Sequence, residues 1–420
     1  MYQAESAGVL LRGGRAEPKG RNARVPRNVL LLGAVSLLTD ISSEMVATVL
    51  PIYLVFALGA SPLQYGVVEG LYQGGAALVR LASGVFADRW QRYKQLAVAG
   101  YGLSALCRAA LLAMGVSVGA VSGIVLADRV GKGIRTAPRD ALISLSAVPE
   151  RLATAFGVHR AMDTAGAMLG PLVAFGVLLA APGRFDAVFA VSLCFAVLGL
   201  AVMVLFVGDR RGRAALDRVV RPGLRSTLRL LRTPLYRRLV VLGAALSLVT
   251  ISDGFLYLAL QRQMDLELTA FPLLFVGSAF SYMVLAVPAG RLADRVGRER
   301  VFVAGYLLLL LVYGALLVPD LGLTVLVVSL ICLGAFYAAT DGVLAAAASA
   351  VLPEGQRGGG LGLLLAATTL AKLAAALLFG LLWTVAGLTT ATVAFAGALA
   401  LATVVALFVV AARRPQEGHV

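Results

Sequence analysis

The sequence predicts an all-α membrane protein whose twelve transmembrane helices form two pseudo-symmetric bundles of six. Its 420 residues are 60% hydrophobic and 14% charged, with a mean hydropathy of +0.88. A soluble domain is nearer half apolar and a quarter charged. Apolar runs of about 20 residues, the length that spans a bilayer, recur along the whole chain, and motifs of the first half return in the second.

The apolar runs define the expected spans and domains. We place the spans at 29–58, 64–87, 95–115, 118–147, 152–181, 185–207, 238–261, 269–290, 301–318, 321–351, 360–386 and 388–411. The domains are then an N-terminal tail (1–28), a first bundle (29–207), a basic linker (208–237), a second bundle (238–411) and a C-terminal tail (412–420). This length leaves no room for a large soluble domain.

The formal net charge of +15 sits mainly in short segments between apolar runs. That distribution is typical of the positive-inside rule, which predicts a multi-pass protein of the cytoplasmic (inner) membrane with both termini in the cytoplasm. It argues against nucleic acid as a partner and for the lipid bilayer. The basic linker is expected to lie on the anionic inner leaflet.

Three segments of the first half recur in the second half in the same order. SLLTDISS at 36–43 returns as SLVTISDG at 247–254, and GVFADRWQRYK at 84–94 returns as GRLADRVGRER at 290–300. SAVPE at 146–150 returns as SAVLPE at 349–354. Parallel six-helix repeats of this kind place a substrate path between the halves, near the bilayer midplane.

The repeated G-x-x-x-D-R-x-x-R segments after spans two and eight resemble the signature loop of the major facilitator superfamily. The copies contain Gly84, Asp88, Arg89 and Arg92, and Gly290, Asp294, Arg295 and Arg298. The resemblance implies a cytoplasmic latch that forms in one access state and breaks in the other. Glycine in the segment allows close approach of two helices. The alternative is that the arginines serve only as topology signals.

Two further elements resemble those of proton-coupled bacterial efflux permeases. Gly166, Gly170 and Pro171 in span five resemble the G-x-x-x-G-P element of the superfamily's antiporters. Arg129 in span four begins an R-x-x-x-G element whose arginine the family associates with proton transfer. For span five the alternative is plain helix packing, because G-x-x-x-G is common in membrane helices.

Ionisable residues inside the predicted spans are costly and should face the interior of a bundle. Span four carries Asp128, Lys132, Arg135 and Arg139 at helical spacing on one face, with Arg129 about 100° away. Asp40 and Glu44 of span one share a face, and we expect Asp40 to lie at a depth similar to that of Asp128. Arg108 of span three is deep enough to pair with an acid of a neighbouring helix. The remaining candidates are Arg160, Asp163, Asp253, Asp341 and Lys372.

We expect Asp40 or Glu44 to carry a proton, because a carboxyl group in an apolar cavity can titrate near neutral pH. Arg129 or Lys132 would modulate it, and Asp163 is a second candidate. The alternative for the pairs of spans four and five is a set of permanent ion pairs that stabilise the bundle.

These observations favour a monomeric secondary transporter that exports a small molecule by proton antiport, without cofactor or metal. Proton-coupled uptake of a metabolite is the first alternative, and a polytopic membrane enzyme is the second. The sequence contains no HExxH, GxSxG or Walker motif, which disfavours an enzyme. A scaffold without transport is disfavoured by the number of embedded charges.

Overall fold

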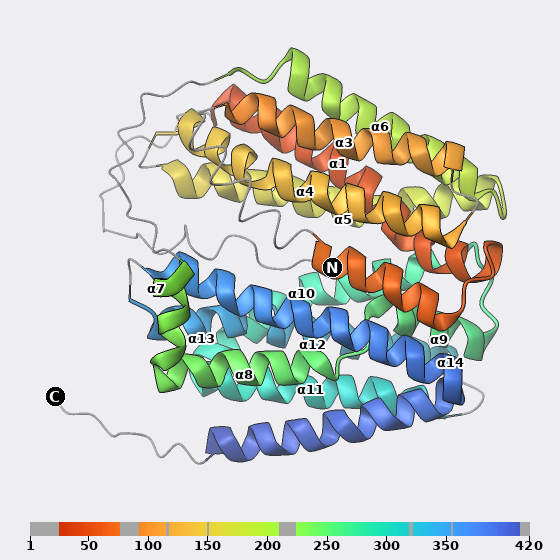
Figure 1. Ribbon diagram of the computed structural model, residues 1–420, viewed down its shortest axis with the longest axis vertical. Helices are drawn as coiled ribbons and strands as arrows, with labels where there is room; N and C mark the ends of the chain where they lie inside the picture. Colours follow the sequence, from red (N-terminus) through yellow and green to blue (C-terminus); the bar gives the residue numbers. More distant parts are fainter. Residues whose placement is uncertain are drawn as a thin grey trace. The chain divides into compact units, whose positions relative to one another are not determined.

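The computed structural model (Figure 1) describes residues 25–75, 92–114, 117–148, 151–209, 224–318, 322–353 and 356–411. Within these residues every regular element is helical. Eight helical segments there are long and apolar enough to cross a membrane, and one of them, 359–410, has 52 residues, which is enough for two crossings. The described chain divides into two compact units, one built on the first six helical segments and the other largely on the later ones.

The first bundle follows the predicted spans closely. It consists of α1 (Arg27–Ile52) with a π-helical turn η1 (Tyr53–Ala57), a helix over 62–75, α3 (Tyr93–Met114), α4 (Val118–Ser146), α5 (Leu152–Ala180) and α6 (Phe185–Leu205). Ser117 caps α4 by accepting a hydrogen bond from the Ala120 amide at 3.2 Å. The charges of α4 make it less apolar than its neighbours, although it has the length of a span.

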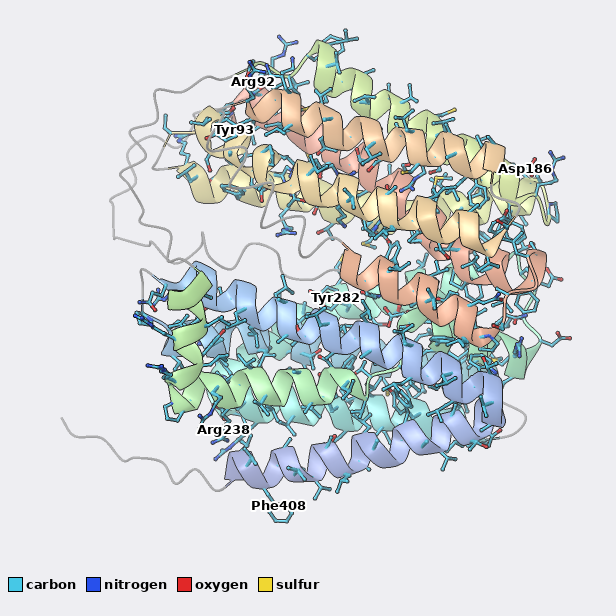
Figure 2. All side chains as sticks on the ribbon, viewed as in Figure 1. Arg92, Tyr93, Asp186, Arg238, Tyr282 and Phe408 are labelled. Atoms are coloured by element: carbon cyan, nitrogen blue, oxygen red, sulfur yellow. The ribbon has the colours of Figure 1, made fainter. Side chains whose placement is uncertain are left out.

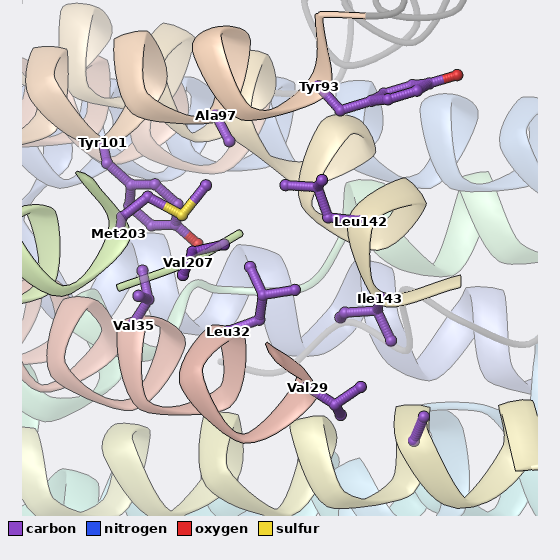
Figure 3. Close-up of a cluster of buried hydrophobic side chains, with 11 residues drawn as sticks. Val29, Leu32, Val35, Tyr93, Ala97, Tyr101, Leu142, Ile143, Met203 and Val207 are labelled. Carbon is purple, nitrogen blue, oxygen red and sulfur yellow. The ribbon is translucent and has the colours of Figure 1, made fainter. Parts of the chain in front are cut away.

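A buried apolar cluster joins the N-terminal ends of α1, α3 and α5 to the C-terminal ends of α4 and α6 (Figure 3). Leu32 of α1, Leu142 of α4 and Met203 of α6 are each 0% exposed. Burying a side chain of this size stabilises a protein by about 1.5–3 kcal/mol in water, but in a bilayer close packing takes over much of that role. The cluster is built from Val29, Leu32, Val35, Tyr93, Ala97, Tyr101, Leu142, Ile143, Ala155, Met203 and Val207.

Helices α1 and α5 pack with their backbones in contact through two glycines. A Cβ atom built on Gly166 would lie 2.5 Å from the Leu37 carbonyl oxygen, and one on Gly170 would lie 2.6 Å from the Glu44 Cβ and 2.9 Å from the Ile41 carbonyl oxygen. A side chain at either position would therefore separate the helices. This is the close packing that small residues permit between membrane helices.

The second bundle begins with two short turns, α7 (Leu224–Arg229) and η3 (Leu230–Arg232). Its longer helices are α8 (Pro234–Leu248), α9 (Asp253–Met264), α10 (Pro272–Val296), α11 (Arg298–Ala315), α12 (Leu323–Thr340), α13 (Val343–Val351) and α14 (Arg357–Ala411). Helix α14 contains a non-helical residue, Gly387 with φ 84°, which is the residue left between the last two predicted spans. Figure 2 shows Phe408 projecting outward from α14, where it is 71% exposed, as a lipid-facing side chain would be.

Each of two predicted spans of this bundle consists of two helices with a break between them. Span 238–261 breaks between α8 and α9, and span 321–351 breaks at Asp341–Gly342, where Gly342 has φ 81°. The Tyr313 hydroxyl pairs with backbone groups freed at the first break. It accepts a hydrogen bond from the Ile251 amide at 2.6 Å and donates one to the Val249 carbonyl at 3.3 Å. Irregular backbone at membrane depth is tolerated when protein groups satisfy it in this way.

The α1–α5 contact predicts that Gly166→Ala destabilises the protein, by about 1–3 kcal/mol for an overpacked position. Its new methyl group meets a backbone carbonyl, which moves only with the helix. Gly176→Ala on the same helix is the matched control, because a Cβ there meets no heavy atom within 4 Å. Thermal unfolding of both variants in detergent checks this, and equal midpoints would contradict the close packing.

Candidate functional site

Asp128 of α4 is the centre of a buried ion-pair cluster in the first bundle. One carboxylate oxygen lies 3.3 Å from Arg108 Nη2, and the other lies 2.5 Å from Arg129 Nη2. The three residues are between 3% and 4% exposed. Asp128 therefore pairs with two buried guanidinium groups, and removing its carboxylate would leave both without this partner.

Hydroxyl groups of α1 complete the coordination of Arg108. Its guanidinium donates to Ser42 Oγ at 3.4 Å and to Ser43 Oγ at 3.2 Å. Asp128 consequently lies beside residues 42–43 of α1, which agrees with the expected depth near Asp40 and Glu44. Arg129 lies with its guanidinium carbon 4.0 Å from the centre of the Tyr72 ring, a distance at which a cation is attracted to an aromatic face. Glu44 acts electrostatically on Arg129.

Asp163 of α5 is the centre of a second cluster. It accepts a hydrogen bond from Ser36 Oγ at 2.6 Å, and its oxygens lie 3.9 Å from Arg139 Nη1 and 3.5 Å from Arg160 Nη1. Arg139 also donates to Ser36 Oγ at 3.2 Å and lies 3.0 Å from Asp140. Helices α1, α4 and α5 therefore meet at this carboxylate.

The carboxyl groups of Asp40 and Asp163 interact with each other. Two adjacent carboxyl groups can share one proton, because two neighbouring negative charges repel strongly where water is excluded. Lys132 and Arg135 of α4 act electrostatically on Asp40 from the other side. Arg135 itself donates to Ser104 Oγ at 2.5 Å. The structure thus brings Asp40 together with Asp163 and not with Asp128.

The polar residues of the predicted α4 stripe all lie inside the bundle. Asp128 and Arg135 are buried, while Lys132 and Arg139 are partly buried. The two clusters also contain four residues that were not predicted from the sequence: Ser36, Ser42, Ser43 and Tyr72. Serine is common on the packed faces of membrane helices, so its identity alone does not indicate that it binds a charged partner.

The ionisable residues of the second bundle gather at its helix breaks. Asp253 occupies the first turn of α9, where it is 9% exposed and accepts a hydrogen bond from the Tyr337 hydroxyl. Asp341 follows the last residue of α12. Lys372 of α14 acts electrostatically on both carboxylates. The tyrosine was not predicted, because nothing in its apolar surroundings marks it.

The second signature loop makes defined contacts, whereas most of the first lies outside the described residues (Gly84, Asp88 and Arg89). Arg298 pairs with Asp294 at 3.1 Å and donates to the Ala346 carbonyl of α13 at 3.1 Å. Arg92 and Arg295 are exposed. Among the described residues, a Cβ atom built on Gly290 would meet no heavy atom within 4 Å, so close approach of a helix at this glycine stays a prediction.

Membrane-length helices that bury acids and bases inside the bundle define the class of a secondary membrane transporter. Searched among the described residues, no group of three His, Cys, Asp or Glu side chains is placed to hold a metal. The chain belongs to the Major Facilitator Superfamily, whose family model matches residues 32–277 and 245–420. It has the fold of that superfamily, with twelve transmembrane helices in two six-helix bundles.

Relatives in sequence and in structure agree with this assignment. The chain is 30% identical to an uncharacterised MFS-type transporter of Methanocaldococcus jannaschii, over 85% of this chain and 88% of that protein. Its fold is similar to the nucleoside transporter NupG, with a TM-score of 0.76 at 15% identity over 91% of this chain and 99% of that one. It is equally similar to a peptide transporter, POT, with a TM-score of 0.76 at 17% identity over 94% and 96% of the two chains.

The Asp128 cluster predicts that Arg108→Gln destabilises the first bundle. Loss of one partner of a buried pair costs up to about 3–5 kcal/mol, and the remaining Arg129 contact reduces that cost. The matched control is Arg184→Gln, which removes an exposed pair with Asp186 at 2.7 Å and should change little. Denaturation in detergent distinguishes them, and a tolerated Arg108→Gln would show that Asp128 does not depend on this arginine.

Proposed function

We propose that this transporter exports a small molecule in exchange for protons, and that the Asp40–Asp163 pair carries the proton. The observation that carries the proposal is the position of Asp40 beside Asp163 in the first bundle. A shared proton leaves such a pair singly charged, and its loss creates a second negative charge in a region that excludes water. The free energy of removing this proton therefore depends on the charges that surround the pair.

The surrounding bases give this pair a means of responding to conformation. Arg139 and Arg160 contact Asp163, and Lys132 and Arg135 act on Asp40. A rearrangement of α4 against α1 and α5 changes these distances and so changes the affinity for the proton, which is what coupling to alternating access requires. Glu44 is the second candidate carrier, with Arg129 as its modulating base.

The remaining parts of the proposal follow from topology. The protein functions as a monomer in the inner membrane with both termini in the cytoplasm, and the signature loops form the cytoplasmic latch. The Arg298 contacts with Asp294 and with the Ala346 carbonyl support the latch, because they tie the loop to the end of a neighbouring helix. Proton-coupled import is the alternative, and the experiment on direction decides between them.

Export predicts that cells making the wild-type protein resist some members of a panel of toxic small molecules better than empty cells. Asp40→Asn should abolish that protection, because a carboxamide neither gains nor loses a proton near neutral pH. Asp186→Asn, an exposed site, is the control. For any compound against which the cells are protected, an uncoupler should increase the amount of that compound retained in the cell. A decrease in the retained amount would indicate import.

The shared proton predicts pH-dependent labelling that needs no known substrate. Dicyclohexylcarbodiimide reacts with protonated carboxyl groups in apolar surroundings, so labelling at Asp40 or Asp163 should fall as the pH rises. Asp40→Asn should abolish labelling at Asp163 too, because Asp163 then keeps its two arginines but has lost the neighbouring carboxylate that favours its protonation. Peptide mass spectrometry locates the label. Undiminished labelling of Asp163 in the variant would refute the shared proton.

A further inference from the structure

Tyr101 of α3 buries a hydroxyl group that no hydrogen bond satisfies in this conformation. The residue is 3% exposed, and its hydroxyl oxygen has no hydrogen-bond partner among the described residues. Buried polar groups of proteins are hydrogen-bonded in the great majority of cases, because an unsatisfied one costs free energy that an apolar group of the same shape would not. A partner in another conformation of the protein would account for this hydroxyl.

The ring of Tyr101, unlike its hydroxyl, is well packed. The guanidinium carbon of Arg135 lies 4.9 Å from the ring centre, and Arg135 also donates to Ser104 Oγ, three residues further along α3. Figure 3 shows Tyr101 with Met203 of α6 and Val35 of α1 in the apolar cluster. The ring is therefore fixed between α1, α4 and α6, and the hydroxyl is the part of the side chain without a partner.

The charges around this hydroxyl belong to the proton site. Both acids of the carboxyl pair, Asp40 of α1 and Asp163 of α5, act on Tyr101 electrostatically, and so do Arg135 and Arg139 of α4. The charged and titratable groups that face the pair itself are Lys132, Arg135, Arg139, His159 and Arg160. Tyr101 thus lies beside the pair as a neutral group with a hydrogen bond to donate.

Helices α3 and α11 occupy equivalent places in the two halves of the chain. The string VAGY occurs in both, and its glycine is Gly100 in α3 and Gly305 in α11. A Cβ atom on Gly100 would lie 2.7 Å from the Gly131 carbonyl oxygen, and one on Gly305 would lie 3.5 Å from the Phe336 carbonyl oxygen. Gly131 and Phe336 are as far apart along the chain as the two glycines are, so α3 crosses α4 at the point where α11 crosses α12.

The tyrosine of this string is Tyr306 in α11, and there the hydroxyl is paired. It interacts with the side chains of Ser247 and Thr250, in the span that repeats α1. In the repeated segment these two residues correspond to the residues four and one positions before Asp40. The repeat therefore assigns the Tyr101 hydroxyl to the part of α1 that carries Asp40.

We propose that the Tyr101 hydroxyl donates a hydrogen bond to Asp40 when the carboxyl pair loses its shared proton. This proposal rests on the proposed function and adds a residue to the same proton site. While the proton is shared, the two carboxyl groups bind each other. When the proton leaves toward solvent, a second negative charge appears in the pair, and a hydrogen bond to a charged group is stronger than one to a neutral group. Tyr101 keeps its own proton throughout.

This contact couples proton release to a movement of helices. The backbones of α3 and α4 touch at Gly100, and those of α1 and α5 touch at Gly166. Tyr101 belongs to the first of these helix pairs, and the two carboxyl groups belong to the second. A hydrogen bond between the helix pairs that forms only after deprotonation favours one arrangement of them, which is how a bound proton shifts a conformational equilibrium.

Tyr101→Phe tests the contact, because it removes the hydroxyl and keeps the ring beside Arg135. Thermal unfolding of the purified full-length protein in detergent, from acidic to alkaline pH, measures the effect. At low pH the variant should be at least as stable as the wild type, because it has lost an unpaired hydroxyl. At high pH it should be less stable, because the deprotonated pair has lost a donor. A purely structural role would change the midpoint equally at every pH.

Asp40→Asn identifies the partner of the hydroxyl. In this background the effect of Tyr101→Phe should no longer depend on pH, because a carboxamide does not titrate, and the double-mutant cycle isolates the coupling between the two residues. Tyr53→Phe is the matched control in the first bundle. Its ring packs on Phe185 and Phe189 beyond the end of α1, and its effect should be the same at every pH.

Carbodiimide labelling gives a second measurement. Without the hydroxyl the pair keeps its proton to higher pH, so the midpoint of labelling at Asp40 or Asp163 should rise by about one pH unit in Tyr101→Phe, a tenfold change that corresponds to about 1.4 kcal/mol. An unchanged labelling midpoint, or an unfolding difference that is the same at every pH, would overturn the proposal. If Asp40→Asn is not monodisperse, the labelling curve of Tyr101→Phe decides.

The two measurements separate this proposal from the proposed function, because neither uses a proton gradient. A shifted midpoint in a protein whose transport does not respond to an uncoupler would count against proton-coupled export alone. Uncoupler-sensitive export with an unshifted midpoint in Tyr101→Phe would count against the role of Tyr101 alone.

Discussion

A charge that enters the hydrocarbon core needs a partner within its own bundle, and this constraint organises the first half of the molecule. Asp128 meets it by contacting two arginines from α3 and α4, and Asp163 meets it with a serine and two arginines. Replacing such groups by apolar ones of similar size is often neutral for stability. The presence of these buried charges is therefore better explained by transport than by folding.

Helix α1 is the element on which both clusters depend. Its serines at 36, 42 and 43 bind Arg139 and Arg108, and Asp40 lies between them. The glycines of α5 allow the two backbones to touch, so the Asp40 and Asp163 side chains meet across the interface. The span-five glycine element thus has a packing role, and that packing positions the carboxyl pair. The packing and functional interpretations of this element are compatible.

Hydropathy and charge predicted the class of fold and most span positions, because both depend on composition over about 20 residues. They did not reveal the breaks at 249–252 and 341–342, because an average over about 20 residues is insensitive to two to four of them, and neither segment contains a proline. At the first break, a hydroxyl group from another helix, that of Tyr313, binds the freed backbone groups. Pairings such as Arg108 with Asp128 also depend on a residue of another helix. Helical spacing indicates which face a side chain occupies, but not which helix lies opposite.

The repeated segment at 36–43 and 247–254 shows how the two halves diverge from similar sequences. Thr39 and Thr250 each donate to the carbonyl four residues earlier, at 2.7 and 2.8 Å. In the first half the helix continues, and an arginine of α3 binds the serine side chains that follow. In the second half, Tyr313 of the corresponding helix binds the backbone itself, and the helix restarts at Asp253. The continuous helix thus presents Asp40 to a neighbouring carboxyl group, whereas the broken one places Asp253 at a helix start, where the Tyr337 hydroxyl donates to it. Similar sequences therefore give a pair of carboxyl groups in the first bundle and a carboxyl group bound by a tyrosine in the second.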